Sequence, residues 1–232
     1  MANNERSLLP EDIQRIMGKD AQRNNIMAAK MVAEIVKTTL GPRGMDKMLV
    51  SPNNDIIVTN DGVTILDEMQ IEHPAAKMMV EIAKTQESEV GDGTTTAVML
   101  AGKLLENAEK LLDKKIHATV ITKGYRIAAE KAQEILLDLA LKITPDDDEI
   151  LRQIAMTAMT GKGAEGSKEI FADILVRAVK QVQNEGRIDL SDIKIEKIKG
   201  SGIKDTELIS GIVLDKEKIS QDMPENILNA KI

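Results

Sequence analysis

The feature that most restricts the fold of this chain is a glycine-bracketed loop that runs directly into a long apolar helix. Two glycines enclose one acid and three threonines follow, in the sequence Val90-Gly91-Asp92-Gly93-Thr94-Thr95-Thr96. Beyond the threonines, apolar residues recur at three- and four-residue spacing as far as Leu112, which is the periodicity of an α-helix. The chain is therefore expected to turn sharply at the glycines and to begin a helix at the threonines.

This loop has the chemistry of a phosphate-binding site. Gly91 and Gly93 admit backbone conformations that are closed to other residues, and the first turn of a helix carries free N–H groups and a partial positive charge. The threonine hydroxyls add further donors. An ionised Asp92 has no proton to donate to a phosphate, so its natural partner is a bridging Mg²⁺ ion.

A second interpretation of the loop is a capped helix after a glycine turn, with Asp92 as the cap. The loop alone favours neither interpretation. It differs from the phosphate loop that ends in Gly-Lys-Ser or Gly-Lys-Thr, because no lysine follows Gly93.

The composition narrows the class of protein. The chain has 232 residues, of which 42% are hydrophobic and 30% charged, so an ordered, packed core is expected. Aromatic residues are only 1% and the net charge is −7, which argues against base-stacking nucleic-acid modules and binders of anionic membranes. The chain has no cysteine, no secretory signal at Met1–Pro10 and no apolar run of bilayer length. We therefore expect a soluble, intracellular protein.

The sequence up to Thr144 predicts helices and one β-hairpin. Asp20 is placed to cap a first helix that ends at Gly41-Pro42, and Asp61-Gly62 is predicted to be an ordinary turn, although an acid there is also a good water or metal ligand. His73 and His117 are interpreted as helix-start residues, because no other histidine or cysteine lies beside them. The expected helices are Ala21–Thr39, Ala75–Glu89, Thr94–Leu112 and Ala118–Ile143, and the expected hairpin strands are Met45–Val50 and Asp55–Thr59.

Beyond Thr144 an acidic cluster marks a change of composition and a predicted domain boundary. A helix over Glu149–Thr160 is expected to end in the loop Gly161-Lys162-Gly163, where a lysine between glycines can approach a phosphate. A helix over Ser167–Gln183 follows, with Ile170, Phe171, Ile174, Leu175, Ala178 and Val179 expected inward. Alternation over Ile193–Ile198 predicts a strand, and Thr206–Leu214 a strand or extended connector. The polar stretch Ser220–Ile232 has no closing element, so the chain is expected to be cut.

Four short motifs, each weak by itself, occur in one chain: Leu40-Gly41-Pro42-Arg43-Gly44-Met45-Asp46-Lys47, Asn60-Asp61-Gly62-Val63-Thr64, Gly91-Asp92-Gly93-Thr94-Thr95-Thr96 and Thr160-Gly161-Lys162-Gly163. Their order and spacing resemble the group II chaperonins, the archaeal members more than the eukaryotic ones. The resemblance covers nearly the whole chain, and the combination is highly specific.

The resemblance implies a mainly α fold with small β elements (α+β). Residues 1–144 would form the N-terminal part of a helical equatorial ATP-binding domain with a β-hairpin. Residues 145–213 would form the N-terminal part of an α/β intermediate domain, and residues 214–232 the truncated start of an apical domain. Such subunits are ATP-dependent cytoplasmic chaperones. Their partners would be other chaperonin subunits of a double ring and unfolded client proteins, with no nucleic acid and no membrane.

The resemblance also assigns roles to residues. Gly91, Asp92, Gly93, Thr94, Thr95 and Thr96 would cradle the phosphates of ATP, with Asp92 as the Mg²⁺ ligand. Leu40, Gly41 and Pro42 would line the nucleotide pocket, and Gly161 would be a further nucleotide-binding residue. Asp61 would orient the attacking water, and Lys162 would reach the γ-phosphate. The hairpin would pair with a neighbouring subunit.

This chain departs from the family pattern by its short length. The second catalytic aspartate, the C-terminal half of the equatorial core and the apical surface lie outside it. We therefore expect a weak or inactive ATPase that is unstable or self-associates. Two alternatives stay open. The first is a truncated, non-catalytic interaction module that associates with a full-length chaperonin. The second is a helical Mg²⁺-dependent nucleotide- or phosphate-binding protein that shares only the Asp92 loop.

Overall fold

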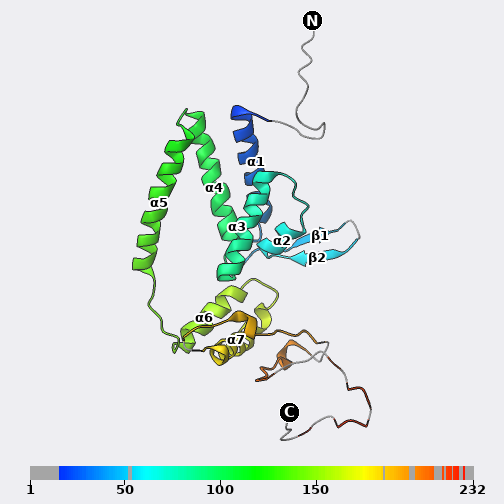
Figure 1. Cartoon of the computed structure of the whole chain (residues 1–232). Helices are drawn as coiled ribbons and strands as arrows, with labels where there is room; N and C mark the ends of the chain where they lie inside the picture. The colour runs from blue at the N-terminus through cyan, green and yellow to red at the C-terminus, as the bar shows by residue number, and fades with distance from the viewer. Residues whose placement is uncertain are drawn as a thin grey trace. The chain divides into compact units, whose positions relative to one another are not determined.

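The computed structural model describes residues 16–51, 54–184, 186–198, 202–211, 216, 218–220, 222–224 and 227. Within these residues it contains seven α-helices, short 3-10 turns and one two-stranded sheet (Figure 1), which confirms the predicted fold class. Two compact units are present. The first comprises the described part of Met1–Thr144 together with Ala158–Glu165, and the second Pro145–Thr157 with the described part of Gly166–Ile232.

The first unit contains most of the helices. In chain order its elements are α1 (Gly18–Lys37), β1 (Lys47–Val50), β2 (Ile56–Thr59), α2 (Gly62–Glu68), α3 (Pro74–Val90), α4 (Thr94–Asp113) and α5 (Ala118–Leu139). His73 and His117 are the N-cap residues of α3 and α5, and each ring accepts a hydrogen bond from the backbone N–H two residues later. This confirms the interpretation of both histidines as helix-start residues.

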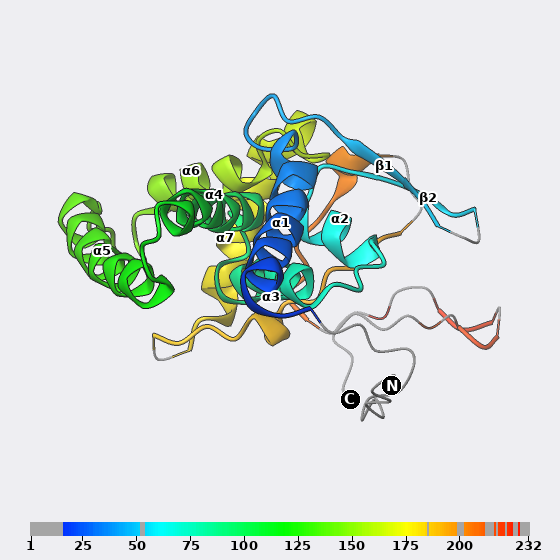
Figure 2. The ribbon, with the colours of Figure 1, turned by 90° about the horizontal axis from the view of Figure 1, so that it is seen from above.

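The core of the first unit lies where α1, α3 and α4 meet around α2 (Figures 1 and 2). Its largest fully buried side chains are Ile65, Leu66, Val36 and Val98. The backbones of α1 and α4 approach closely at Gly102, where a Cβ atom would lie 2.3 Å from Cβ of Ala33. Mainly Ala and Val side chains at helical spacing thus pack these helices into one buried cluster.

The hairpin forms as predicted. β1 and β2 pair antiparallel with Lys47 opposite Thr59 and Val50 opposite Ile56. Met48, Val50, Ile56 and Val58 share one face, and each is more than half exposed. The pairing of this face with a neighbouring subunit stays a prediction.

The second unit is built on α6 (Asp148–Met159), whose last two residues belong to the first unit, and α7 (Lys168–Val182), with short turns η1 (Glu165–Ser167), η2 (Leu190–Asp192) and η3 (Ile203–Asp205). The buried residues of α7 are Ala172, Val176 and Ala178, whereas Ile170 is exposed. The predicted inward face was therefore only partly right, because only a narrow strip of α7 is covered.

Three local predictions were wrong. Asp20 lies in the first turn of α1 and the N-cap is Met17, without a side-chain cap. Asp61-Gly62 opens the helix α2 and is not a simple turn. No strand forms over 193–198, where Ile195 and Ile198 are 74% and 84% exposed. Alternating polarity describes an exposed and a covered face, but a strand also needs a neighbour, and none lies beside this segment within the described residues.

The segment after η3 is not a strand either. Residues 206–211 have no regular secondary structure, and residues 212–214 of the predicted strand or connector lie outside the described part. Within the described residues, no helix combines the length and apolar character needed to cross a bilayer.

Candidate functional site: a glycine-rich site at the start of α4

The loop between α3 and α4 is shaped by two left-handed glycines. Gly91 ends α3 with φ 74° and donates its N–H to the carbonyl of Glu87 at 2.8 Å. Gly93 has φ 76° and is the N-cap of α4, with no side-chain hydrogen bond. Any other residue at these two positions would be strained. Asp92, between them, is thus not the helix cap, and the capped-helix interpretation of its carboxylate is wrong.

Because α4 lacks a side-chain cap, its first turn is available to an anion. The N–H groups of a helix's first turn have no intrahelical acceptor, and those of α4 come from Thr94, Thr95 and Thr96. A helix of 20 residues adds the positive end of its dipole. Gln86 of α3 stabilises the loop, because its Nε2 donates a hydrogen bond to the carbonyl of Asp92 at 2.9 Å. No sequence signal singles out Gln86, because it lies within a helical pattern.

The turn at Asp61 packs against this first turn of α4. Asp61 caps α2: its Oδ2 accepts from the N–H of Thr64 at 2.9 Å and from the Thr64 hydroxyl at 2.8 Å. A Cβ atom at Gly62 would lie 2.6 Å from Oγ1 of Thr95, so only glycine allows the approach. The cap and the close contact together hold the Asp61-Gly62 turn against the first turn of α4.

A third segment, after α1, joins the site through Gly161. Gly41 has φ 83° and accepts a hydrogen bond from the N–H of Gly44 at 2.9 Å, which closes a turn. A Cβ atom on Gly161 would lie 3.2 Å from Cα of Pro42 and 3.3 Å from the carbonyl oxygen of Gly41. Leu40 precedes this turn, and its side chain is 43% exposed.

The fourth segment brings Lys162 to Asp92. Lys162 Nζ lies 3.3 Å from Oδ1 of Asp92, and the two side chains are 40% and 45% exposed. The Asn60 side chain donates from Nδ2 to the carbonyl of Gly161. Ala158–Glu165 belongs to the first unit, so these contacts are internal to it. The assignment of residues 145–213 to an intermediate domain stays a prediction.

The four sequence motifs are therefore linked by contacts: three of them contact one another in a ring, and the Gly41-Pro42 motif joins through Gly161. Gly161 abuts Gly41-Pro42, Asn60 bonds to Gly161, Gly62 abuts Thr95, and Lys162 pairs with Asp92. Asn60 was not among the predicted site residues. Its sequence signal is that it opens the second motif, directly before Asp61.

The donor set suits a hard cation that is shared with a ligand. No cluster of three or more His, Cys, Asp or Glu side chains able to hold a metal exists in the described part of the chain. A metal at Asp92 would thus take most of its ligands from water and phosphate oxygens, which is the habit of Mg²⁺. Lys162 shows that the Asp92 carboxylate accepts a cation in this place.

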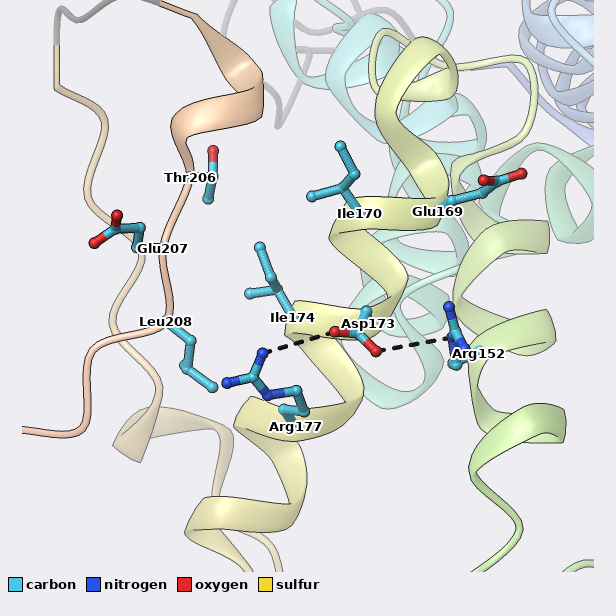
Figure 3. A pocket seen from close by; sticks show the side chains of 9 residues that line it. All are labelled: Arg152, Glu169, Ile170, Asp173, Ile174, Arg177, Thr206, Glu207 and Leu208. Atoms are coloured by element: carbon cyan, nitrogen blue, oxygen red, sulfur yellow. Dashed lines mark ion pairs between the residues drawn. The ribbon is translucent and has the colours of Figure 1, made fainter.

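The second unit contains a separate, open cavity of about 580 Å³ beside α7 (Figure 3). Asp173 lies between the two arginines of this cavity, with Arg177 Nη1 at 3.7 Å and Arg152 Nε at 4.0 Å. Glu169 and Glu207 also line it. Because the acids outnumber the arginines, the cavity does not favour a phosphate.

Comparison with known proteins agrees with the arrangement of the motifs. The sequence profile of the TCP-1/cpn60 chaperonin family matches residues 32–232. A thermosome subunit of Methanopyrus kandleri is 61% identical over 229 residues, which are 97% of this chain and 42% of that protein. A thermosome subunit of Methanothermococcus thermolithotrophicus is 56% identical over 232 residues, the whole of this chain and 43% of that protein.

A third relative, a thermosome subunit of Pyrococcus horikoshii, is 57% identical over 229 residues, again 97% of this chain and 42% of that protein. The chain thus spans about two fifths of the length of the curated relatives that it matches. The resemblance that the four motifs indicated is confirmed. The chain belongs to the TCP-1/cpn60 chaperonin family.

Proposed function

We propose that this chain is the nucleotide-binding part of an ATP-dependent chaperonin subunit. One observation carries the proposal: four segments that are distant in the sequence are joined by contacts, and two of them, at Gly62 and Lys162, reach the loop and first turn at the uncapped N-terminus of α4. A turn with only a structural role would not need a helix N-terminus without a side-chain cap. It would also not need a lysine and an aspartate beside that N-terminus. The chain would work with other chaperonin subunits in the cytoplasm, and the assembly would act on unfolded client proteins.

The phosphates of ATP would lie at the first turn of α4. Gly91 and Gly93 leave the backbone open to close approach, and Thr94, Thr95 and Thr96 supply N–H and hydroxyl donors. Asp92 would hold Mg²⁺, whose charge offsets that of the phosphates when it is bound. Leu40, Gly41, Pro42 and Gly161 would line the pocket.

Asp61 is suited to orient a water for attack. Its Oδ2 is used in the cap of α2, which fixes the plane of the carboxylate, while Oδ1 makes no hydrogen bond to the described residues. A carboxylate oxygen held in this way can accept a proton from a bound water. Lys162 would contribute positive charge to the transferring phosphoryl group. We expect weak or no turnover from the chain alone, because the family's second catalytic aspartate lies outside it.

Calorimetric titration of Mg-ATP into the purified chain tests the proposal. Asp92→Asn should weaken binding by at least about tenfold, since it removes a charge-assisted interaction. Asp67→Asn is the matched control: Asp67 pairs with Lys84 at 2.6 Å away from the site, so the substitution should leave binding unchanged. Equal binding by the Asp92 variant and the control would overturn the assignment.

The alternative function is a passive interaction module that associates with a full-length chaperonin. The exposed apolar faces of the hairpin and of α5 favour it. Turnover separates the two: a nucleotide-binding part should gain ATPase activity when the remaining sequence of a longer relative is supplied, and a passive module should not.

A further inference from the structure

We propose that Lys162 is an internal counter-ion of Asp92 that Mg²⁺ must displace before the site can load, an inference that rests on the proposed function. The contact that carries it is the 3.3 Å approach of Lys162 Nζ to Oδ1 of Asp92. The lysine ammonium therefore forms an ion pair with the carboxylate that would bind the metal. The lysine offsets the single negative charge of Asp92, and its ammonium would repel a metal bound to the same carboxylate, so the two cations compete.

The position of Lys162 beside Asp92 is set by the packing of its backbone and not only by the length of its side chain. Its backbone is held by Gly161, which has φ 76° and abuts Pro42 and the carbonyl of Gly41. Asn60 then ties the carbonyl of Gly161 to the turn that carries Asp61. Because two other segments hold the residue before Lys162, the lysine side chain starts from a defined place within reach of the loop.

Gly161 is also fixed from its other side, where its N–H donates to Oε2 of Glu165 at 2.8 Å. The N–H and the carbonyl of Gly161 therefore both form hydrogen bonds to side chains, which gives the loop a defined conformation. Asn60 is accordingly a positioning residue for Lys162. The sequence at Asn60-Asp61 would serve the site twice, once to hold the lysine and once to orient water.

Competition has a consequence that a simple phosphate-binding lysine lacks. With Mg²⁺ present, removal of Lys162 frees Asp92 for the metal and should tighten binding. Without metal, removal of Lys162 leaves a bare carboxylate beside the phosphate-binding amides, and like charges repel. The effect of the lysine on nucleotide binding therefore changes sign with the metal.

The test is calorimetric titration with ADP, which has no γ-phosphate for the lysine to contact. Lys162→Met should bind Mg-ADP about two- to fivefold more tightly, the range expected when one exposed ion pair no longer has to be broken. In EDTA the same variant should bind ADP more weakly than the parent. Lys84→Met, which removes an exposed ion pair elsewhere in the first unit, should change neither affinity.

Two further variants sharpen the result. Asn60→Ala should shift both affinities in the same directions as Lys162→Met but by less, because it only releases the loop. In an Asp92→Asn background, Lys162→Met should no longer tighten Mg-ADP binding. Circular dichroism of each variant checks that the helices are intact.

Weaker Mg-ADP binding by Lys162→Met, or the same affinity as the parent, would overturn the counter-ion proposal while the nucleotide site stands. Failure of the parent chain to bind Mg-ATP or Mg-ADP at all, in a folded sample, would instead overturn the proposed function on which it rests.

Discussion

Two neighbouring helices of the first unit, α4 and α5, have similar lengths and similar apolar periodicity, but their surroundings differ greatly. Both are long, of 20 and 22 residues, and both carry apolar residues at helical spacing. In α4 one face enters the core, where Val98 is fully buried and Ala101 and Leu105 pack against the buried cluster. In α5 only Ile121 is buried among the described residues, and Leu136, Leu137 and Leu139 are 65%, 76% and 73% exposed.

The arrangement of the helices explains the difference. α4 lies between α1 and α5, so α4 has neighbours on two sides, whereas α5 meets α4 only near its own start (Figures 1 and 2). The Tyr125 hydroxyl donates to the carbonyl of Leu104 at 2.6 Å in this region. Periodicity thus predicts that a helix forms and which face is apolar, but not that the chain supplies a partner for that face. We expect the α5 face to be covered in a larger assembly or to drive self-association.

The largest expected contrast is between a leucine in the core, on α2, and a leucine on the exposed face of α5. Leu66 is 1% exposed in the core, and Leu66→Ala should lower the free energy of unfolding by about 2–5 kcal/mol, because it removes buried methyl groups and leaves a cavity. Leu136→Ala on α5 should change it by less than about 0.5 kcal/mol. Urea unfolding followed by circular dichroism measures both. A similar loss in the two variants would mean that α5 is packed in solution.

The two helices also contain a matched pair of glycines. Gly102→Ala on α4 should destabilise by about 1–3 kcal/mol, because the new Cβ would lie 2.3 Å from Cβ of Ala33. Gly124→Ala on α5 has nothing within 4 Å and should stabilise by about 0.5–1 kcal/mol through helix propensity. The change in melting temperature should therefore have opposite signs. The same sign in both would contradict the contrast between the helices.

Association should respond to α5 and not to the core. The triple variant Leu136→Gln, Leu137→Gln, Leu139→Gln should reduce concentration-dependent self-association of the chain with little change in its unfolding, because those side chains are already exposed. Sedimentation velocity over a range of concentrations measures the effect. Matched substitutions Val50→Gln and Val58→Gln on the hairpin separate the two exposed faces. If neither the α5 variant nor the hairpin variants changed self-association, the exposed apolar faces would not be the surfaces through which the chain associates.

The smallest expected effect concerns pH and α4. Lys103 and Lys110 donate to Glu106 and lower its pKa from 4.5 to about 2. A carboxyl whose pKa is lower in the folded chain stabilises it above the unfolded pKa, so this contribution is present above pH 4.5 and is lost as pH falls toward 2. Glu106→Gln should flatten the loss of stability over that range. An unaltered acid limb in thermal melts at successive pH values would contradict this cause.

Much of the fold could be predicted from the sequence, because the information was local. Six of the seven helices follow from apolar spacing, and the hairpin from β-branched runs around a turn. The helix α2 was missed because Asp61-Gly62 also has the composition of a turn. The strand at 193–198 was wrong because pairing is not a local property.

The candidate site was predictable in its parts but not in its contacts. Glycine conformations at Gly91 and Gly93 follow from the sequence, but the approach of Lys162 to Asp92 joins residues 70 positions apart. The Asn60 and Gln86 contacts have no distinctive motif, since amide side chains occur anywhere on a surface. Only the packing of the segments brings these groups together.

We propose that four segments of the first unit form one nucleotide site and that the exposed face of α5 takes no part in it. Hydrogen exchange of the chain with and without Mg-ATP tests it most directly. Slower exchange in all four segments, residues 40–44, 60–64, 91–97 and 160–163, with no change along residues 124–139, is the predicted result. Protection confined to residues 91–97, or protection along α5 in place of the other segments, would contradict the account.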